Sequence, residues 1–178
     1  MTKLNHDSHL RKALLNDKEV IWKIIEKAII RRKEDGSKQW QDRYPNLDSI
    51  ENDIKNDYGY VLESENKILG YAAIMFEIEP AYEIIEGEWL SDQKYVVIHR
   101  VAISEECIGL GLATKIFKKI ERIAVFNNIF SIKVDTNFDN IPLLRILDKL
   151  KYTYCGEVYF RGSARKAFQK LLKLEDSY

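Results

Sequence analysis

Two long stretches of the chain place apolar residues at helical spacing. The first follows Asn16 and Glu19, which make a capping-box-like start, and it ends at Gly36. Its apolar positions are Val20, Ile21, Ile24, Ile25, Ala28 and Ile29. The second begins at Leu112, and its apolar positions are Leu112, Ile116, Ile120, Ile123 and Ala124. Residues three and four apart lie on one face of a helix, so both stretches predict amphipathic helices.

Shorter runs rich in apolar or β-branched residues predict strands. These runs cover residues 9–14, 59–63, 67–77, 95–103, 129–135 and 152–160. The polar turn at 64–66 is short enough to join its neighbours as an antiparallel hairpin. The run at 95–103 is apolar along most of its length, which favours a strand buried on both faces.

Further helices are predicted at 47–56, 141–150 and 163–174. Asp139 or Asn140 caps the second of these, and Pro142 suits its first turn. The last helix rests on its apolar positions, Ala167, Phe168, Leu171 and Leu172. Residues 78–94 are too irregular for one long element and are interpreted as a substrate-side loop with extended pieces. This order of elements predicts one α/β domain, of the α+β type, over residues 1–178.

Composition narrows the class of protein. The chain has 178 residues with 46% hydrophobic composition, enough to bury a core. Lys plus Arg and Asp plus Glu each number 28, so net charge indicates neither nucleic acid nor an anionic membrane as a partner. The N-terminus has no apolar core of signal-peptide length, and no stretch reaches the roughly 20 apolar residues of a membrane span. We therefore expect a cytoplasmic protein.

The cysteines do not indicate a metal site or a disulfide scaffold. Cys107 and Cys155 are the 2 cysteines of the chain, and they lack the paired spacing of a zinc site. We expect reduced thiols and no metal. Cys107 lies near a predicted helix start, where a thiol can become nucleophilic, but no histidine partner is evident in the sequence.

A predicted strand, a small-residue turn and a helix start follow one another between residues 95 and 112. Gly109 and Gly111 lie in the turn, where a missing Cβ lets the backbone approach a ligand. The first turn of a helix has unpaired N–H groups, so the junction suits a phosphate or pyrophosphate. The Walker and dinucleotide-binding patterns are both absent from the sequence.

The segment Ile108-Gly109-Leu110-Gly111-Leu112-Ala113 resembles the acyl-CoA signature of the GNAT superfamily of N-acetyltransferases, Arg/Gln-x-x-Gly-x-Gly/Ala. Ile108 stands where the signature has its basic residue. The resemblance continues with Asn140 at a helix start and with Leu150-Lys151-Tyr152 in place of a closing Leu-Gly-Phe triplet. Leu147 stands where many members have a Tyr that protonates the departing thiolate. The likeness covers about residues 58 to 160.

This resemblance implies a mixed, mostly antiparallel sheet flanked by helices, and acetyl transfer from acetyl-CoA to a primary amine by direct attack in a ternary complex. The oxyanion donor would be the backbone N–H of Val101, with Ala102 and Ile103 as further strand contacts. The implied acetyl-CoA contacts are completed by Ile108, Gly109, Leu110, Gly111, Leu112, Ala113, Thr114 and Asn140.

The reaction needs a neutral amine, so a proton acceptor is required. His99 is the candidate base, although a lone His in an apolar strand is more often a core residue; Glu77 and Asp135 are alternatives that would act through water. Tyr154, near Tyr152, is the candidate acid, with strand packing as the alternative. The neighbouring Arg100 is interpreted as structural, needing a buried or interfacial partner.

Other functions remain open at the level of sequence. Ile108 and Leu147 depart from the family pattern and suggest a non-catalytic acyl-CoA-binding or regulatory module, and a nucleotide could use the same helix end. The acceptor amine is unidentified, because the loops at 40–44 and 78–94 would form its pocket. The acidic, aromatic segment at 77–88 would attract a cationic amine or would be a solvated surface. A homodimer through the C-terminal helix or a strand edge is possible.

Overall fold

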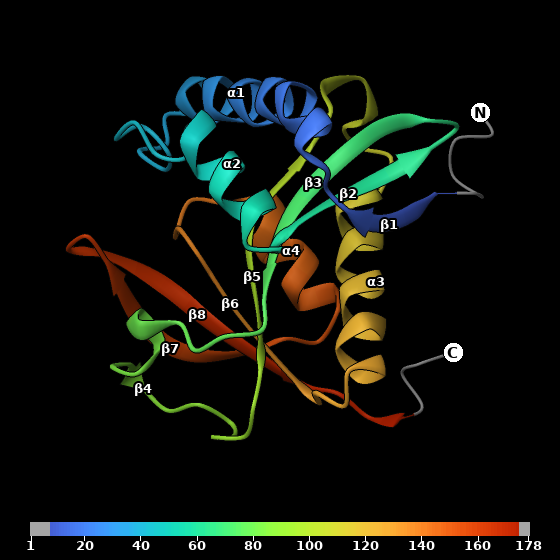
Figure 1. Cartoon of the computed structure of the whole chain (residues 1–178). Coiled ribbons are helices and arrows are strands. Elements are labelled where there is room, and N and C mark those ends of the chain that lie inside the picture. Colours follow the sequence, from blue (N-terminus) through green and yellow to red (C-terminus); the bar gives the residue numbers. More distant parts are fainter. Residues whose placement is uncertain (1–7, 175–178) are drawn as a thin grey trace. The chain divides into compact units, whose positions relative to one another are not determined.

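The computed structural model describes residues 8–174, which form two compact units (Figure 1). The first unit comprises residues 8–74 and 100–116, and the second comprises 75–99 and 117–174. Strand β5 (Val96–Ile103) and helix α3 (Leu112–Phe126) each begin in one unit and end in the other. Residues 1–7, where we expected no signal peptide, lie outside the described residues.

The first unit pairs three antiparallel strands with two helices. Its strands are β1 (His9–Lys12), β2 (Gly59–Ser64) and β3 (Lys67–Met75), paired in that order. The second half of β5 lies beside β3, and Ser104 N–H donates to the Leu69 carbonyl over 2.9 Å. The helices are α1 (Lys18–Glu34) and α2 (Leu47–Lys55), which pack on each other (Figure 1). The predicted hairpin is confirmed, with Glu65 and Asn66 at positive φ in its turn.

The two helices start differently. Helix α1 begins at Lys18 after a 3₁₀ turn (Leu15–Asp17), in which the Asp17 carboxylate accepts the Leu14 N–H over 2.8 Å, and its N-cap is Asp17 without a side-chain capping bond, so the expected cap at Asn16 is wrong. The Asn46 side chain accepts the Ser49 N–H over 2.9 Å and caps α2. The apolar core under these helices consists of Ala13, Ile21, Ile24, Ile25, Ala28, Ile50, Val61, Ile68, Tyr71 and Ala102.

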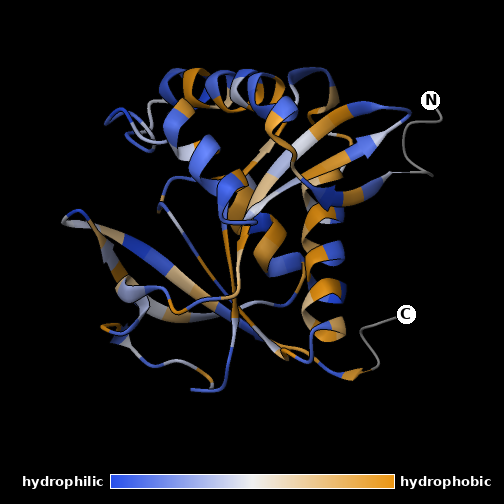
Figure 2. Cartoon of the chain, viewed as in Figure 1, coloured by the Kyte–Doolittle hydropathy of each residue, from blue (hydrophilic) through white to orange (hydrophobic). Residues whose placement is uncertain are grey.

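The second unit is built on a mixed sheet. Strand β6 (Ser131–Thr136) pairs in parallel with β5 through Val96–Ile98, and antiparallel neighbours follow in the order β8 (Ser163–Leu171), β7 (Thr153–Phe160) and β4 (Glu86–Gly87). The expected mixed, mostly antiparallel sheet is therefore confirmed. Helix α4 (Ile141–Lys149) precedes β7, and 3₁₀ turns occur at Pro80–Tyr82 and Glu105–Cys107. Figure 2 shows hydrophobic and hydrophilic residues on successive turns of α3, as its spacing predicts.

The predicted C-terminal helix at 163–174 is wrong. Residues 163–171 form β8, which lies between β6 and β7. Arg161 and Gly162 both have positive φ and make the two-residue turn of a β7–β8 hairpin. Because β8 has a partner on each side, three consecutive residues, 167–169, are buried, and the alternation typical of a strand is lost. A dimer through a C-terminal helix is accordingly ruled out for 163–171, and within 8–174 no helix has both the length and the apolar character to cross a bilayer.

The buried side chain of Gln169 allows a test of the role of β8 in the fold. Its buried amide accepts the Leu90 N–H over 2.7 Å and donates to the Ser91 carbonyl and to Ser131 Oγ over 3.1 and 2.8 Å. Gln169→Leu leaves these groups without their partner, so we expect a loss of about 3 kcal/mol in the free energy of unfolding. Urea denaturation measures it. The exposed Ser163→Ala on the same strand is the control, and equal stability of the two variants would contradict the role of this amide.

Lys151, directly after α4, has φ 64. This left-handed position corresponds to the Gly of the triplet that the chain resembles, and a lysine there is strained. Lys151→Gly should therefore raise the free energy of unfolding by about 0.5–1 kcal/mol. Arg145→Gly, at an exposed position in the interior of α4, should lower it by about 1 kcal/mol. Thermal unfolding distinguishes the two, and a loss of stability in Lys151→Gly would refute the argument.

Candidate functional site

The glycine turn of the first unit has the backbone geometry of an anion site. Gly109 and Gly111 have φ values of 80 and 76, in the left-handed region that favours glycine. A Cβ built on either residue would meet no atom within 4 Å. Ile108 and Leu110 are each 47% exposed, so the turn faces open space. The glycines are therefore needed for the path of the backbone, and a ligand has room to approach it.

Helix α3 begins directly after this turn. The Lys115 N–H donates to the Gly111 carbonyl over 3.1 Å, which closes the first turn of the helix. Helix geometry leaves the preceding N–H groups, those of residues 112–114, without an intrahelical acceptor. The first turn contains no acidic residue that would repel an anion. The predicted residues from Ile108 to Thr114 thus fit a pyrophosphate.

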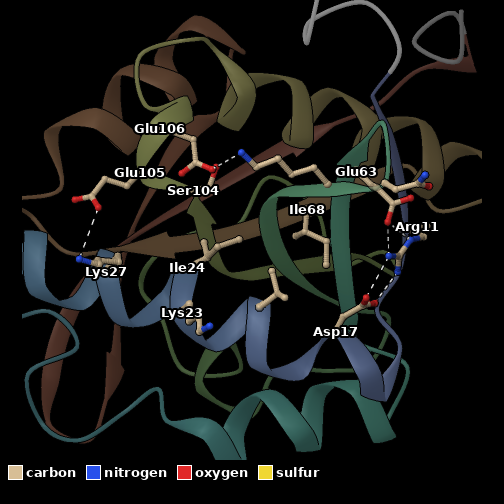
Figure 3. Close-up of a pocket in the computed structure, with 13 residues that line it drawn as sticks. Arg11, Asp17, Lys23, Ile24, Lys27, Glu63, Ile68, Ser104, Glu105 and Glu106 are labelled. Atoms are coloured by element: carbon tan, nitrogen blue, oxygen red, sulfur yellow. Dashed lines mark hydrogen bonds and ion pairs between the residues drawn. The ribbon is translucent and has the colours of Figure 1, made fainter.

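The acidic residues just before the turn are paired with lysines. Glu106 lies 2.8 Å from Lys67 Nζ, and Glu105 lies 3.8 Å from Lys27 Nζ (Figure 3). Both pairs line a cavity of about 510 Å³ that also contains Arg11 beside Asp17. This cavity contains none of the predicted site residues. Its opposite charges face each other, so we do not assign the cofactor to it.

The second half of β5 carries the predicted strand contacts. Ala102 is buried, and Val101 and Ile103 are partly buried. β3 approaches this segment so closely that a Cβ on Gly70 would lie 3.0 Å from the Ala102 carbonyl oxygen. The preceding residue, Arg100, is held by the Asp53 carboxylate, so the expectation that it needs a buried partner is confirmed.

In the second unit, His99 lies between two carboxylates. Its Nε2 is 3.0 Å from Glu79 Oε2, and its Nδ1 is 3.7 Å from Asp135 Oδ1. The side chains of His99 and Glu79 are each 14% exposed, and that of Asp135 is 5% exposed. We call His99, Glu79, Asp135 and Tyr82 the His99 cluster. Its histidine is hydrogen-bonded to a carboxylate and still reaches solvent.

Tyr82 completes the His99 cluster from the 3₁₀ turn. Its hydroxyl donates to Asp135 Oδ1 over 2.7 Å. Burial, and then the Asp135 carboxylate, raise the pKa of Tyr82 well above its ordinary value, so the phenol stays a neutral donor. Phe160 packs edge-on against both rings, with centroids 6.0 Å from His99 and 6.2 Å from Tyr82. These contacts fix the ring of His99 in place.

The other predicted residues of this unit lie apart from His99. Tyr154 is on β7, three strands from β5, which is roughly 14 Å across a sheet. It is 51% exposed and packs on Phe168 at a centroid distance of 5.6 Å. Asn140 caps α4, accepting the Leu143 N–H over 3.3 Å as predicted. Leu147 is fully buried.

The aromatic residues of the predicted acceptor loops pack largely inward. Trp40 lies against the core of the first unit. Trp89 donates from Nε1 to the Tyr82 carbonyl over 2.9 Å. Lys133 Nζ lies 4.2 and 4.1 Å from the ring centroids of Trp89 and Tyr95. Among the aromatics of these two loops, Trp40 and Trp89 thus serve packing, and Tyr95 directly after the second loop packs with Trp89 around Lys133.

Sequence reasoning missed two members of the His99 cluster. Glu79 was grouped only with the acidic residues of its segment, and Tyr82 with the aromatics. Their partners are 20 and 53 residues away along the chain, so periodicity holds no signal for them. The alternative base Glu77 is exposed. No group of three or more His, Cys, Asp or Glu within residues 8–174 could hold a metal ion.

Comparisons with known proteins identify the family of the chain. The profile of the "Acetyltransferase (GNAT) family" matches residues 22–152. A GNAT family acetyltransferase from Streptococcus agalactiae is 35% identical, with 94% of this chain and 97% of that chain covered and a TM-score of 0.86. A putative acetyltransferase from Staphylococcus aureus Mu50 is 26% identical, with 92% and 99% covered and a TM-score of 0.71.

A third structure shares the fold alone. It is a putative acetyltransferase from Salmonella typhimurium, solved with its cofactor acetyl-CoA, at 17% identity, with 94% and 95% covered and a TM-score of 0.66. A search of curated proteins found no match. The family profile spans most of the chain and the Streptococcus structure spans nearly all of it, so the chain belongs to the GNAT acetyltransferase family.

Proposed function

We propose that this protein transfers an acetyl group from acetyl-CoA to a primary amine by direct attack in a ternary complex. Acetyl-CoA is the typical co-substrate of the GNAT family, and the Salmonella structure contains it. The observation that carries the proposal is His99, hydrogen-bonded to Glu79 and placed two residues before Val101 on the same strand. A proton acceptor and an oxyanion donor are the groups that amine acetylation needs.

Backbone groups would bind the co-substrate. The N–H groups after Gly111 suit the pyrophosphate without the basic side chain that Ile108 replaces. Val101 N–H would donate to the oxyanion, and Ala102 and Ile103 would bind the pantetheine arm through their backbone. Asn140 stays a predicted contact of the co-substrate. In the structure its side chain caps α4.

His99 would accept the proton of the amine. In the tautomer in which Nε2–H donates to Glu79, Nδ1 carries the lone pair. Asp135, 3.7 Å from Nδ1, would stabilise the imidazolium that forms. Tyr82 donates to the same carboxylate and so keeps Asp135 oriented. Glu79 also places negative charge beside His99, where a cationic amine would arrive, which favours a basic acceptor, whereas Asp135 has Arg165 Nη1 at 3.8 Å from its Oδ2.

The steps of the reaction balance. The amine nitrogen attacks the thioester carbonyl, and its electron pair forms the C–N bond while the carbonyl oxygen becomes an oxyanion. His99 takes the proton from nitrogen. Collapse of the oxyanion breaks the C–S bond and releases CoA thiolate. A thiol has a pKa of about 8.5, so the thiolate can leave unassisted. Tyr154 therefore stays a prediction as acid, and the scheme does not require it.

A thiol-release assay across a panel of amines tests the proposal. The panel contains polyamines, amino acids, aminoglycosides and lysine peptides, each at several pH values. We expect CoA release that depends on one class of basic amine. In parallel, thermal shifts with CoA, ATP and NAD test the ligand, and only CoA should stabilise the protein at low concentration. CoA binding without turnover of any amine would favour a binding module, and stabilisation by ATP or NAD alone would favour a nucleotide-binding protein.

Gly111→Glu should weaken CoA binding strongly. The side chain places bulk and negative charge at the helix start, so we expect the Kd to rise on the order of 100-fold, about 2.7 kcal/mol. Isothermal titration measures the Kd. Gly36→Glu is the control, since Gly36 has φ 77 and the same open surroundings but lies at the end of α1. Equal CoA affinity of the Gly111 and Gly36 variants would refute the site.

His99→Ala should spare CoA binding and lower kcat on the order of 100-fold, because general base catalysis contributes that much. Glu79→Gln removes the carboxylate that sets the tautomer, and we expect a decrease of about 10-fold. Steady-state kinetics from pH 6 to 9 measure both effects. Glu83→Gln, an exposed residue of the same segment, is the control. Full activity of His99→Ala over this range would remove His99 from the mechanism.

A further inference from the structure

Arg100 has a backbone conformation that is unusual for its place in the fold. Its φ is 53, in the left-handed region that is costly for residues with a Cβ. Among residues 8–174, the other non-glycine residues with positive φ lie in turns or bends, and Arg100 alone lies within a strand. Such conformations persist only where the surroundings hold them, and they occur often at functional sites.

The Arg100 side chain is held inside the first unit by a fork of hydrogen bonds. Its Nε donates to Asp53 Oδ2 over 2.8 Å, and its Nη2 donates to Asp53 Oδ1 over 2.5 Å. Nη1 donates to the Tyr44 hydroxyl. The exposed fractions are 10% for the Arg100 side chain and 4% for that of Asp53. A bidentate pair of this kind defines the orientation of both side chains.

Other groups around the pair add hydrogen bonds and support the charge of Arg100. Tyr71 donates from its hydroxyl to Asp53 Oδ2 over 2.7 Å. Burial, and then Asp53, raise the pKa of Tyr71, so it remains a neutral donor. Burial alone would lower the pKa of Arg100, but the Asp53 carboxylate, with Tyr44 and Tyr71, offsets this, and the pKa is raised. The pair therefore keeps both charges in a site where either charge alone would be costly.

We propose that the Arg100–Asp53 pair is a positioning device that holds residue 100 left-handed and so aims the N–H of Val101. That N–H belongs to the peptide unit between the two residues, and its direction changes with ψ of Arg100. A local break in a strand changes the direction of the backbone groups that follow it. Asp53 comes from α2, Tyr71 from β3 and Tyr44 from the loop between α1 and α2, so three elements hold one peptide. The inference rests on the proposed function of Val101 as oxyanion donor.

A paired substitution tests the device without leaving a buried charge. Arg100→Met with Asp53→Leu replaces both charges by apolar groups, which often preserves folding. We expect kcat to fall on the order of 100-fold, as for loss of an oxyanion donor, with the Kd of CoA within 3-fold of the wild type. Lys170→Met with Glu121→Leu is the matched control, because it removes another ion pair, of 2.9 Å, far along the sequence from β5. This control should keep kcat.

A rescue separates positioning from mere stability. With Asp53→Leu retained, Gly in place of Met at residue 100 accepts positive φ at little cost. We expect Arg100→Gly with Asp53→Leu to recover about 10-fold in kcat over the Met variant, since glycine reopens the left-handed conformation. Unchanged kcat in the Met variant, or no recovery with Gly, would overturn the proposal. Should the Met variant fail to fold, Arg100→Lys keeps the charge without the fork, and an unchanged kcat there would overturn it equally.

An activity-independent measurement distinguishes the failure of this inference from that of the proposed function. The ¹H–¹⁵N shift of the Val101 amide should move in the Met variant, move back with Gly, and stay constant in the Lys170 and Glu121 control. A wild type that acetylates no amine would refute the proposed function. A Val101 amide shift that ignores the loss of the pair would refute the positioning device, whether or not the wild type is active.

Discussion

The buried ion pair between Arg100 and Asp53 is the interaction on which the middle of β5 depends. Up to Ile98 this strand pairs in parallel with β6, and after Arg100 it lies beside β3, with Ser104 bonded to Leu69. A regular strand would need no left-handed residue between these segments. Arginine has no intrinsic preference for positive φ, so the hydrogen bonds of the pair offset the energetic cost of this left-handed conformation.

The proposed base and the proposed oxyanion donor both lie on β5. His99 precedes the break and faces Glu79 and Asp135, whereas Val101 follows it in the other unit. The proposed base and donor are two residues apart in sequence, on one strand. The carboxylates come from Glu79, which caps the 3₁₀ turn at Pro80–Tyr82, and from β6, and they contact the imidazole from outside β5. Supporting side chains of this kind determine whether a residue type becomes a catalytic group.

Elements with a strong local signal were predictable from sequence. The period of α1 and α3, the β2–β3 turn and the apolar run of β5 are local patterns, and the structure confirms them. The helix predicted at 163–174 was wrong because Ala167, Phe168, Leu171 and Leu172 fit helical spacing. Burial on both faces hid the strand pattern of β8. The turn before it, Arg161-Gly162, lacks the Asn or Asp that usually marks such a hairpin.

The residues of the candidate site also divide into those with a local sequence signal and those without one. Gly109 and Gly111 were recognisable because their conformation is a property of the local backbone. The partners of His99 and Arg100 were not, since Glu79 and Asp53 lie 20 and 47 residues away and meet them only through the fold. Leu147 is also recognisable from the sequence, because a leucine has no proton to donate where the family pattern has a tyrosine. In the structure its side chain is fully buried. Under the proposed function, Leu147 offers no proton to the leaving thiolate, and catalysis would depend on attack by the amine, which the His99 cluster and Val101 would serve.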